Sequence, residues 1–131
     1  MIRPRVLLAD DNHEFLAAEI ALLRPHFEIV GTAGDGASLI SDVQRLKPDV
    51  VVVDITMPVM NGIDAVHKIK AFDSTVKIVF MTSNNREEYV KACLAEGARG
   101  YVWKSLLKSH LIPAIYAVLE DLPYVSPLTI S

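Results

Sequence analysis

Five polar side chains follow short apolar runs of the chain, and together they have the chemistry of a site for a metal ion and a phosphate group. These residues are Asp10, Asp11, Asp54, Thr82 and Lys104. Carboxylates that converge on a small area repel one another unless a cation is present. Mg²⁺ fits this role, because it typically takes one or two carboxylates together with waters and a phosphate. A lysine ammonium and a threonine hydroxyl could then bind the phosphate oxygens, whereas no His and Cys spacing indicates zinc.

Asp54 is the most informative of the five, because it ends an apolar run. The segment Val51–Pro58 reads VVVDITMP, and its three valines favour a buried strand. An ionised aspartate in an apolar environment is costly unless a cation pairs with it or a metal ion binds it. The pattern therefore indicates that a positive group compensates for the charge of Asp54.

The other residues also have ordinary structural interpretations. Asp10–Asn12 could simply cap a helix, where Asp and Asn are common. Thr82 could belong to a turn, and a lysine such as Lys104 after a strand is usually a solvated surface residue. The hypothesis of a phosphate site depends on the combination, since a suitable side chain follows each of four predicted strands.

The apolar pattern predicts a scaffold of alternating strands and helices for these residues. The predicted strands are Val6–Ala9, Phe27–Ala33, Val50–Val53, Ile78–Met81 and Tyr101–Trp103. A helical pattern follows each strand, over Arg86–Glu96 for the fourth helix and along a face from Leu107 to Leu122 for the last. Five such units indicate an α/β fold, a doubly wound parallel sheet with helices on both faces. In such sheets ligands bind outside the carboxyl ends of the strands.

Pro113 fits the helical pattern of the last segment poorly. If the last helix starts near Leu107, Pro113 lies inside it and removes a backbone hydrogen bond. We therefore expect either a later start, which would place Pro113 in the first turn, or a kink.

Composition excludes several classes of protein. The 131 residues fit one domain, and a hydrophobic content of 51% is ordinary for a globular protein. A net charge of -3 gives no indication of contact with nucleic acid or an anionic membrane. The single cysteine, Cys93, excludes an internal disulfide. The sequence shows neither a signal peptide nor an apolar run long enough to span a membrane, so we expect a cytoplasmic protein.

Four segments resemble the receiver domain of two-component response regulators, over essentially the whole length of the chain. They read LLADDN, VVVDITMPVMNG, VFMTSNN and GYVWKS, in the order of the family. The resemblance implies a flavodoxin-like fold with five strands in the order 2-1-3-4-5 and five flanking helices. It also implies a signalling switch that is phosphorylated by a histidine kinase. Such a domain assists its own phosphorylation and dephosphorylation but is not otherwise an enzyme.

The resemblance gives the acidic residues defined roles. Asp54 matches the phosphoacceptor, which forms an acyl phosphate. Asp10 and Asp11 match the acidic pair that binds Mg²⁺ together with Asp54, and the backbone carbonyl of Thr56 matches a further ligand.

The same resemblance assigns the residues of the switch. Thr82 would hydrogen-bond the phosphoryl oxygens, and Lys104 would form an ion pair with them. Tyr101 matches the aromatic switch residue, which turns inward when Thr82 moves toward the phosphate. The surface that changes would comprise the fourth helix, the fifth strand and the fifth helix.

Two segments depart from the family pattern or extend it. Many receivers have a cis proline after the lysine, whereas here Ser105 follows Lys104, so we expect either a strained cis bond or a rearranged trans link. The segment Leu122–Pro127 resembles a linker to a LuxR-type helix-turn-helix domain, although a free tail is an alternative. We therefore expect a receiver over residues 1–122 and a linker or tail over 123–131. DNA would then be contacted only by a missing C-terminal domain, and the chain itself could form a homodimer.

Three other functions remain open from the sequence. A haloacid-dehalogenase-type phosphatase also uses an aspartate nucleophile with Mg²⁺, but Thr56 stands where its second aspartate would be. A flavodoxin-like flavin binder would have its phosphate repelled by Asp10 and Asp11. A receiver-like module that works by protein contacts alone is the remaining alternative.

Overall fold

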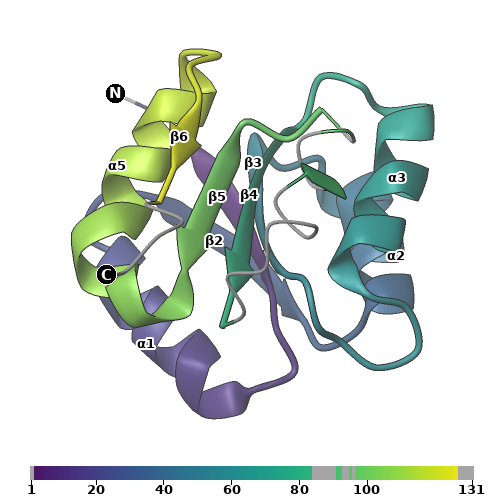
Figure 1. The fold of residues 1–131 in the computed structure, drawn as a ribbon, viewed down its shortest axis with the longest axis horizontal. Helices are drawn as coiled ribbons and strands as arrows, with labels where there is room; N and C mark the ends of the chain where they lie inside the picture. Colours follow the sequence, from purple (N-terminus) through teal and green to yellow (C-terminus); the bar gives the residue numbers. More distant parts are fainter. Residues whose placement is uncertain (1, 84–90, 93–94, 96, 127–131) are drawn as a thin grey trace.

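A six-stranded sheet with all strands parallel forms the centre of the protein (Figure 1). The computed structural model describes residues 2–83, 91–92, 95 and 97–126. The strands are β1 (Arg5–Ala9), β2 (Glu28–Ala33), β3 (Val50–Asp54), β4 (Lys77–Thr82), β5 (Gly100–Trp103) and β6 (Tyr124–Val125). Their order in the sheet is β2-β1-β3-β4-β5-β6. The predicted order of the first five strands is therefore confirmed.

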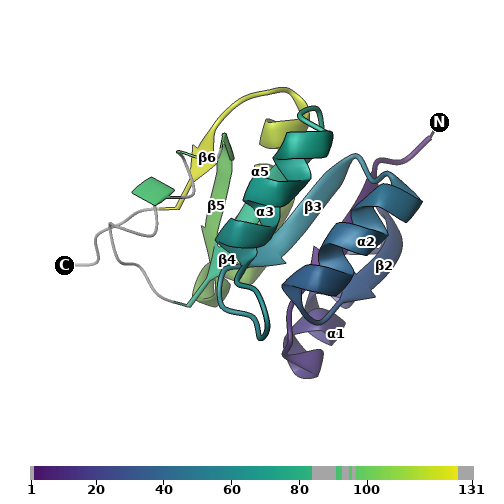
Figure 2. The same cartoon turned by 90° about the vertical axis from the view of Figure 1, so that its right-hand side faces the viewer.

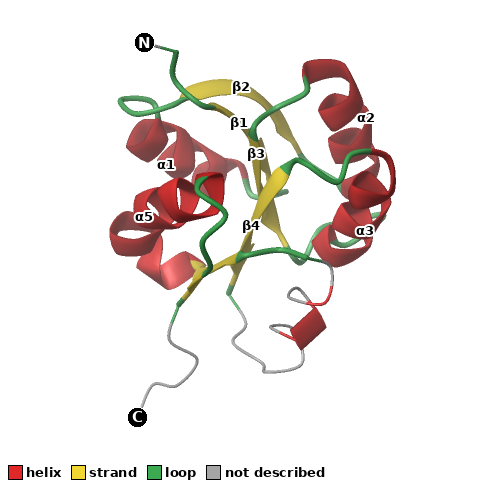
Figure 3. Cartoon of the chain, turned by 90° about the horizontal axis from the view of Figure 1, so that it is seen from above, coloured by secondary structure: helices red, strands yellow, loops and turns green. Residues whose placement is uncertain are grey.

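Helices cover both faces of the sheet, as expected for a doubly wound fold. They are α1 (His13–Leu23), α2 (Gly36–Leu46), α3 (Gly62–Phe72) and α5 (Leu107–Leu119), with a short 3-10 helix η1 (Lys104–Leu106) before α5. Helices α1 and α5 lie on one face and α2 and α3 on the other (Figure 3). Figure 2 shows α2 and α3 side by side in front of the sheet. Most of the predicted helix over Arg86–Glu96 lies outside the described residues.

Strand β3 shows why the central strands are almost wholly apolar. Val51 and Val53 pack into the core under α2 and α3, whereas Val50 and Val52 pack into the core under α1 and α5. Because successive side chains point to opposite faces, a strand covered on both sides cannot alternate with polar residues. The run of valines stops at the carboxyl end of β3, where Asp54 is the first polar residue.

The sheet has one strand more than predicted. Tyr124 and Val125 pair in parallel with Gly100 and Tyr101 of β5. The backbone N–H of Ser126 also donates to the carbonyl of Tyr101 over 2.9 Å. Without β6, β5 would be the last strand of the sheet and would expose unpaired backbone N–H and C=O groups. Pairing with β6 satisfies some of these groups. A strand of two residues has no apolar period, so the sequence pattern could not indicate it.

The structure settles the geometry around Lys104 and Pro113. The described residues contain no cis peptide bond, so the link between Lys104 and Ser105 is trans. It opens η1, which avoids the cost of about 3–4 kcal/mol for a non-proline cis bond. Helix α5 starts at Leu107 with Pro113 inside it, so a later start was a wrong expectation. The apolar face also ends earlier than predicted, because Leu122 lies beyond the helix and is exposed.

No helix in the described ranges is long and apolar enough to cross a bilayer.

Candidate functional site

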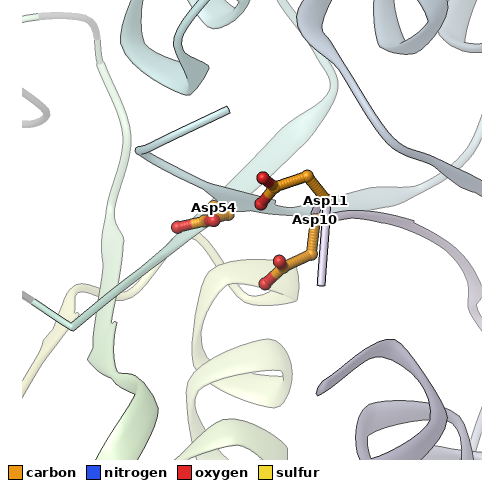
Figure 4. Close-up of side chains that lie close together, drawn as sticks. All are labelled: Asp10, Asp11 and Asp54. Carbon is orange, nitrogen blue, oxygen red and sulfur yellow. The ribbon is translucent and has the colours of Figure 1, made fainter. Parts of the chain in front are cut away.

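Three carboxylates meet at the carboxyl ends of two neighbouring strands (Figure 4). Asp10 and Asp11 follow β1, and Asp54 is the last residue of β3. One oxygen of each carboxylate lies within 4.8 Å of the others. Asp10 and Asp54 are 1% and 5% exposed, whereas Asp11 faces solvent. The pairing of β1 with β3 therefore brings together residues that are more than 40 positions apart in the sequence.

The turn after β1 both fixes the side chain of Asp10 and caps the first turn of α1, and Asn12 makes both hydrogen bonds. The backbone N–H of Asn12 donates to Asp10 Oδ1 over 2.9 Å. Asn12 in turn caps α1, since its side-chain oxygen accepts from the N–H of Phe15 over 3.0 Å. The capping function considered for the whole acidic turn is thus carried by Asn12, and both aspartates remain available to the site.

The start of α3 packs directly against the end of β3. Asp54 Oδ1 accepts from the backbone N–H of Thr56 over 3.3 Å, and the N–H of Gly62 donates to the carbonyl of Ile55 over 2.7 Å. A β-carbon on Gly62 would lie 2.2 Å from the carbonyl oxygen of Asp54. Only glycine permits this approach, which fixes the backbone that carries Asp54.

Lys104 brings a positive charge to the acidic residues from two strands away. Its Nζ lies 2.7 Å from Asp10 Oδ2 and 3.3 Å from Asp54 Oδ2. It also lies over the ring of Phe15, 4.5 Å from the centroid. One ammonium offsets one of three carboxylates, and a divalent cation would offset the other two. Hard carboxylate oxygens at this spacing suit Mg²⁺, so the residues present fit that metal.

The buried charges shift one another's pKa values. Burial raises the pKa of Asp54 to about 6, with a further rise from the charge of Asp10 and an opposing effect of Lys104. Burial by itself would lower the pKa of Lys104. Its hydrogen bond to Asp10 and the charge of Asp54 reverse this, and the pKa of Lys104 is raised overall. The ammonium is therefore firmly charged beside the two carboxylates.

Glu19 is a buried acid near the site that was not singled out from the sequence. It lies on α1, is 1% exposed, and its Oε1 has no hydrogen-bond partner among the described residues. Burial, followed by the charge of Asp10, raises the pKa of Glu19 to about 9, so the side chain is protonated at neutral pH. The signal was its spacing, because Glu19 stands between Leu16 and Leu23 on the apolar face of the helix.

The remaining predicted residues, Thr56, Thr82 and Tyr101, lie near the carboxyl ends of the strands or in the core beneath them. Thr82 is buried at the end of β4, one position beyond Met81, which pairs with Asp54. Tyr101 is fully buried in β5 and belongs to the core under α2 and α3. Thr56 is exposed just after β3. Thr82 thus ends near the acidic residues, while the ring of Tyr101 lies in the interior.

Known proteins share this sequence pattern. The profile of the response regulator receiver domain matches residues 6–116. The chemotaxis protein CheY of Halobacterium salinarum is 36% identical over 115 residues, which cover 88% of this chain and 96% of that protein. The transcriptional regulatory protein DegU of Brevibacillus brevis is 30% identical over 125 residues. These cover 94% of this chain but only 53% of DegU.

Solved structures share the fold. A LuxR-family two-component response regulator from Aurantimonas sp. SI85-9A1 superposes with a TM-score of 0.91 at 30% identity, covering 95% of this chain and 91% of that one. A chain of the CheX–CheY–BeF3–Mg²⁺ complex from Borrelia burgdorferi has a TM-score of 0.81 at 26% identity, covering 89% and 90%. With the profile match over most of its length, the chain belongs to the family of response regulator receiver domains.

Proposed function

We propose that this receiver domain is a phosphorylation-dependent signalling switch, in which Asp54 accepts a phosphoryl group from a sensor histidine kinase. A carboxylate oxygen of Asp54 would form a bond to phosphorus as the bond between phosphorus and the kinase histidine nitrogen breaks, which yields an acyl phosphate. The observation that carries the proposal is the position of Asp54, between a carboxylate pair and the ammonium of Lys104. Phosphoryl transfer needs mainly positioning and charge stabilisation, which these groups supply.

Asp10, Asp11 and Asp54 would hold Mg²⁺, together with the backbone carbonyl of Thr56. When bound, the metal supplies positive charge against the phosphoryl oxygens and against the carboxylates that surround them. The spacing of the three carboxylates supports this assignment, as does the Mg²⁺ named in the complex of the Borrelia burgdorferi relative.

Lys104 and Thr82 would bind the phosphoryl oxygens once Asp54 is modified. Lys104 would exchange its contact with Asp54 Oδ2 for one with the phosphoryl group, and Thr82 would donate a hydrogen bond from the end of β4. Because Tyr101 is already buried, phosphorylation would stabilise this inward orientation. The added charge would in this way bias the surface formed by the fourth helix, β5 and α5.

The output would lie outside the domain. The DegU relative is about twice as long as the matched region, and the Aurantimonas structure is of the LuxR family. Both support a receiver over residues 1–122 and a connection over 123–131 to a transcriptional output domain, which would make any DNA contact. Homodimerisation and a location in the cytoplasm belong to the same proposal. The domain would act on no separate substrate.

Intact mass spectrometry after incubation with acetyl phosphate and Mg²⁺ tests the proposal. We expect one labile phosphoryl adduct, which disappears in Asp54→Asn and persists in the control variant Asp42→Asn, an aspartate of α2 that pairs with Arg45. An unmodified protein would instead favour a module that works through protein contacts. Continuous hydrolysis of unrelated phosphoesters would favour a phosphatase of the haloacid dehalogenase type.

A further inference from the structure

The ammonium of Lys104 has a third contact in addition to the two carboxylates. The Phe15 ring lies beneath it, with 4.5 Å between Nζ and the ring centroid. The negative face of an aromatic ring attracts a cation at this distance, most strongly where water is partly excluded. The Lys104 side chain is only 18% exposed. The ring therefore closes a side of the ammonium that Asp10 and Asp54 leave open.

The ring and one of the carboxylates are held by the same short turn. Asn12 donates its backbone N–H to Asp10 and accepts from the N–H of Phe15 through its side chain. Phe15 also packs against the core under α1 and α5. Asp10 and Phe15, two of the residues that contact Lys104, thus belong to one hydrogen-bonded turn, whereas the lysine itself has a flexible four-carbon stem.

We propose that Phe15 is a positioning residue of this site, whose ring holds the Lys104 ammonium between Asp10 and Asp54, where a phosphoryl group would meet it. The effect on phosphorylation rests on the function proposed above, but the position of the ammonium does not. Without the ring, the lysine stem has more freedom to turn toward solvent. The Lys104 ammonium would then have to return to its place between Asp10 and Asp54 before each phosphoryl transfer.

The placement of the ammonium can be measured without any phosphorylation. In the unmodified protein, the ring current of Phe15 should shift the Lys104 Cε protons upfield in NMR spectra. Phe15→Leu should abolish this shift, and Phe15→Tyr should retain it. Phe72→Leu, an exposed phenylalanine on α3, is the control and should leave it unchanged. Lys104 resonances that are identical in the wild type and Phe15→Leu would overturn the proposal.

The consequence for the reaction is tested with acetyl phosphate, because a small donor removes any contribution of α1 to binding a kinase. Phe15→Leu should slow adduct formation by about two- to thirtyfold, the range expected for a cation–π contact. Phe15→Tyr should stay close to wild type. In a Lys104→Met background, Phe15→Leu should have no further effect, since the two residues act as one unit.

The NMR and acetyl phosphate experiments together distinguish failure of the proposed phosphorylation from failure of the proposed function of Phe15. An equal loss of rate from Phe15→Leu with and without Lys104 would show that the ring acts only through packing and would overturn the positioning function. If the wild type forms no adduct, the proposed function fails, whereas the NMR comparison still decides whether the Phe15 ring lies against the Lys104 ammonium.

Discussion

Burial strongly changes the protonation of the Glu19 side chain. In the folded protein burial keeps it protonated up to about pH 9, whereas an unfolded chain releases the proton near the usual value of 4.5. Between these values the folded state binds more protons than the unfolded state. The contribution of Glu19 to stability is therefore complete below about pH 4.5 and is lost progressively as the pH rises toward 9.

Glu19→Gln should remove this loss, because the amide does not titrate. Urea unfolding at several pH values should show the wild type losing stability relative to Glu19→Gln, on the order of 2–3 kcal/mol between pH 5 and pH 7. The exposed Glu14→Gln on the same helix is the control and should follow the wild type. Parallel curves for the wild type and Glu19→Gln would contradict a buried, protonated glutamate.

The sequence predicted which residues form the site better than it predicted the contacts between them. Asp54 and Lys104 stand out because polar groups after buried strands are unusual. The contact of Lys104 with Phe15 and the burial of Glu19 depend on how α1 packs against the sheet. That arrangement is a property of tertiary packing, and apolar periodicity does not encode it.

At the scale of the elements, the close approach of the start of α3 to the end of β3 fixes the backbone that carries Asp54. Gly62→Ala would place a methyl group against the carbonyl oxygen of Asp54, and backbone cannot yield as a flexible side chain does. We expect a destabilisation of about 1–3 kcal/mol in chemical denaturation and a slower reaction with acetyl phosphate.

Gly34→Ala is the matched control, because nothing lies within 4 Å of a β-carbon at that position. It should leave both stability and adduct formation close to wild type. Equal effects of the two substitutions would show that loss of glycine flexibility, and not the clash with Asp54, is responsible.

Elements with a clear apolar pattern were predicted well, since the predicted strand Val50–Val53 corresponds to β3. The pattern misled at Leu122, which continues the helical spacing of α5 although the chain leaves the helix after Leu119. It was silent on β6, since two residues are too few to show a period. Short elements form because a neighbour offers hydrogen bonds, and the sequence of the short element alone does not reveal that neighbour.

At the scale of the whole molecule, the fold holds like charges together at one edge of the sheet, and a divalent cation should therefore stabilise it. Thermal unfolding should shift to higher temperature with Mg²⁺ than with a chelator. At a concentration 100 times the dissociation constant, the gain is about 2.7 kcal/mol. Asp11→Asn should reduce the shift, and Asp42→Asn, which removes a carboxylate that pairs with Arg45 on α2, should not. An undiminished shift in Asp11→Asn would contradict metal binding at this edge.

Strand β6 places Tyr124 and Val125 at the outer side of the sheet, next to β5. In the sheet order, β4 and β5 lie between β3, which carries Asp54, and β6. Neighbouring strands are about 4.8 Å apart, so β3 and β6 are separated by roughly 14 Å of continuous hydrogen-bonded sheet. Any displacement of the Asp54 backbone that spread along the sheet would therefore reach β6 across three strand pairings.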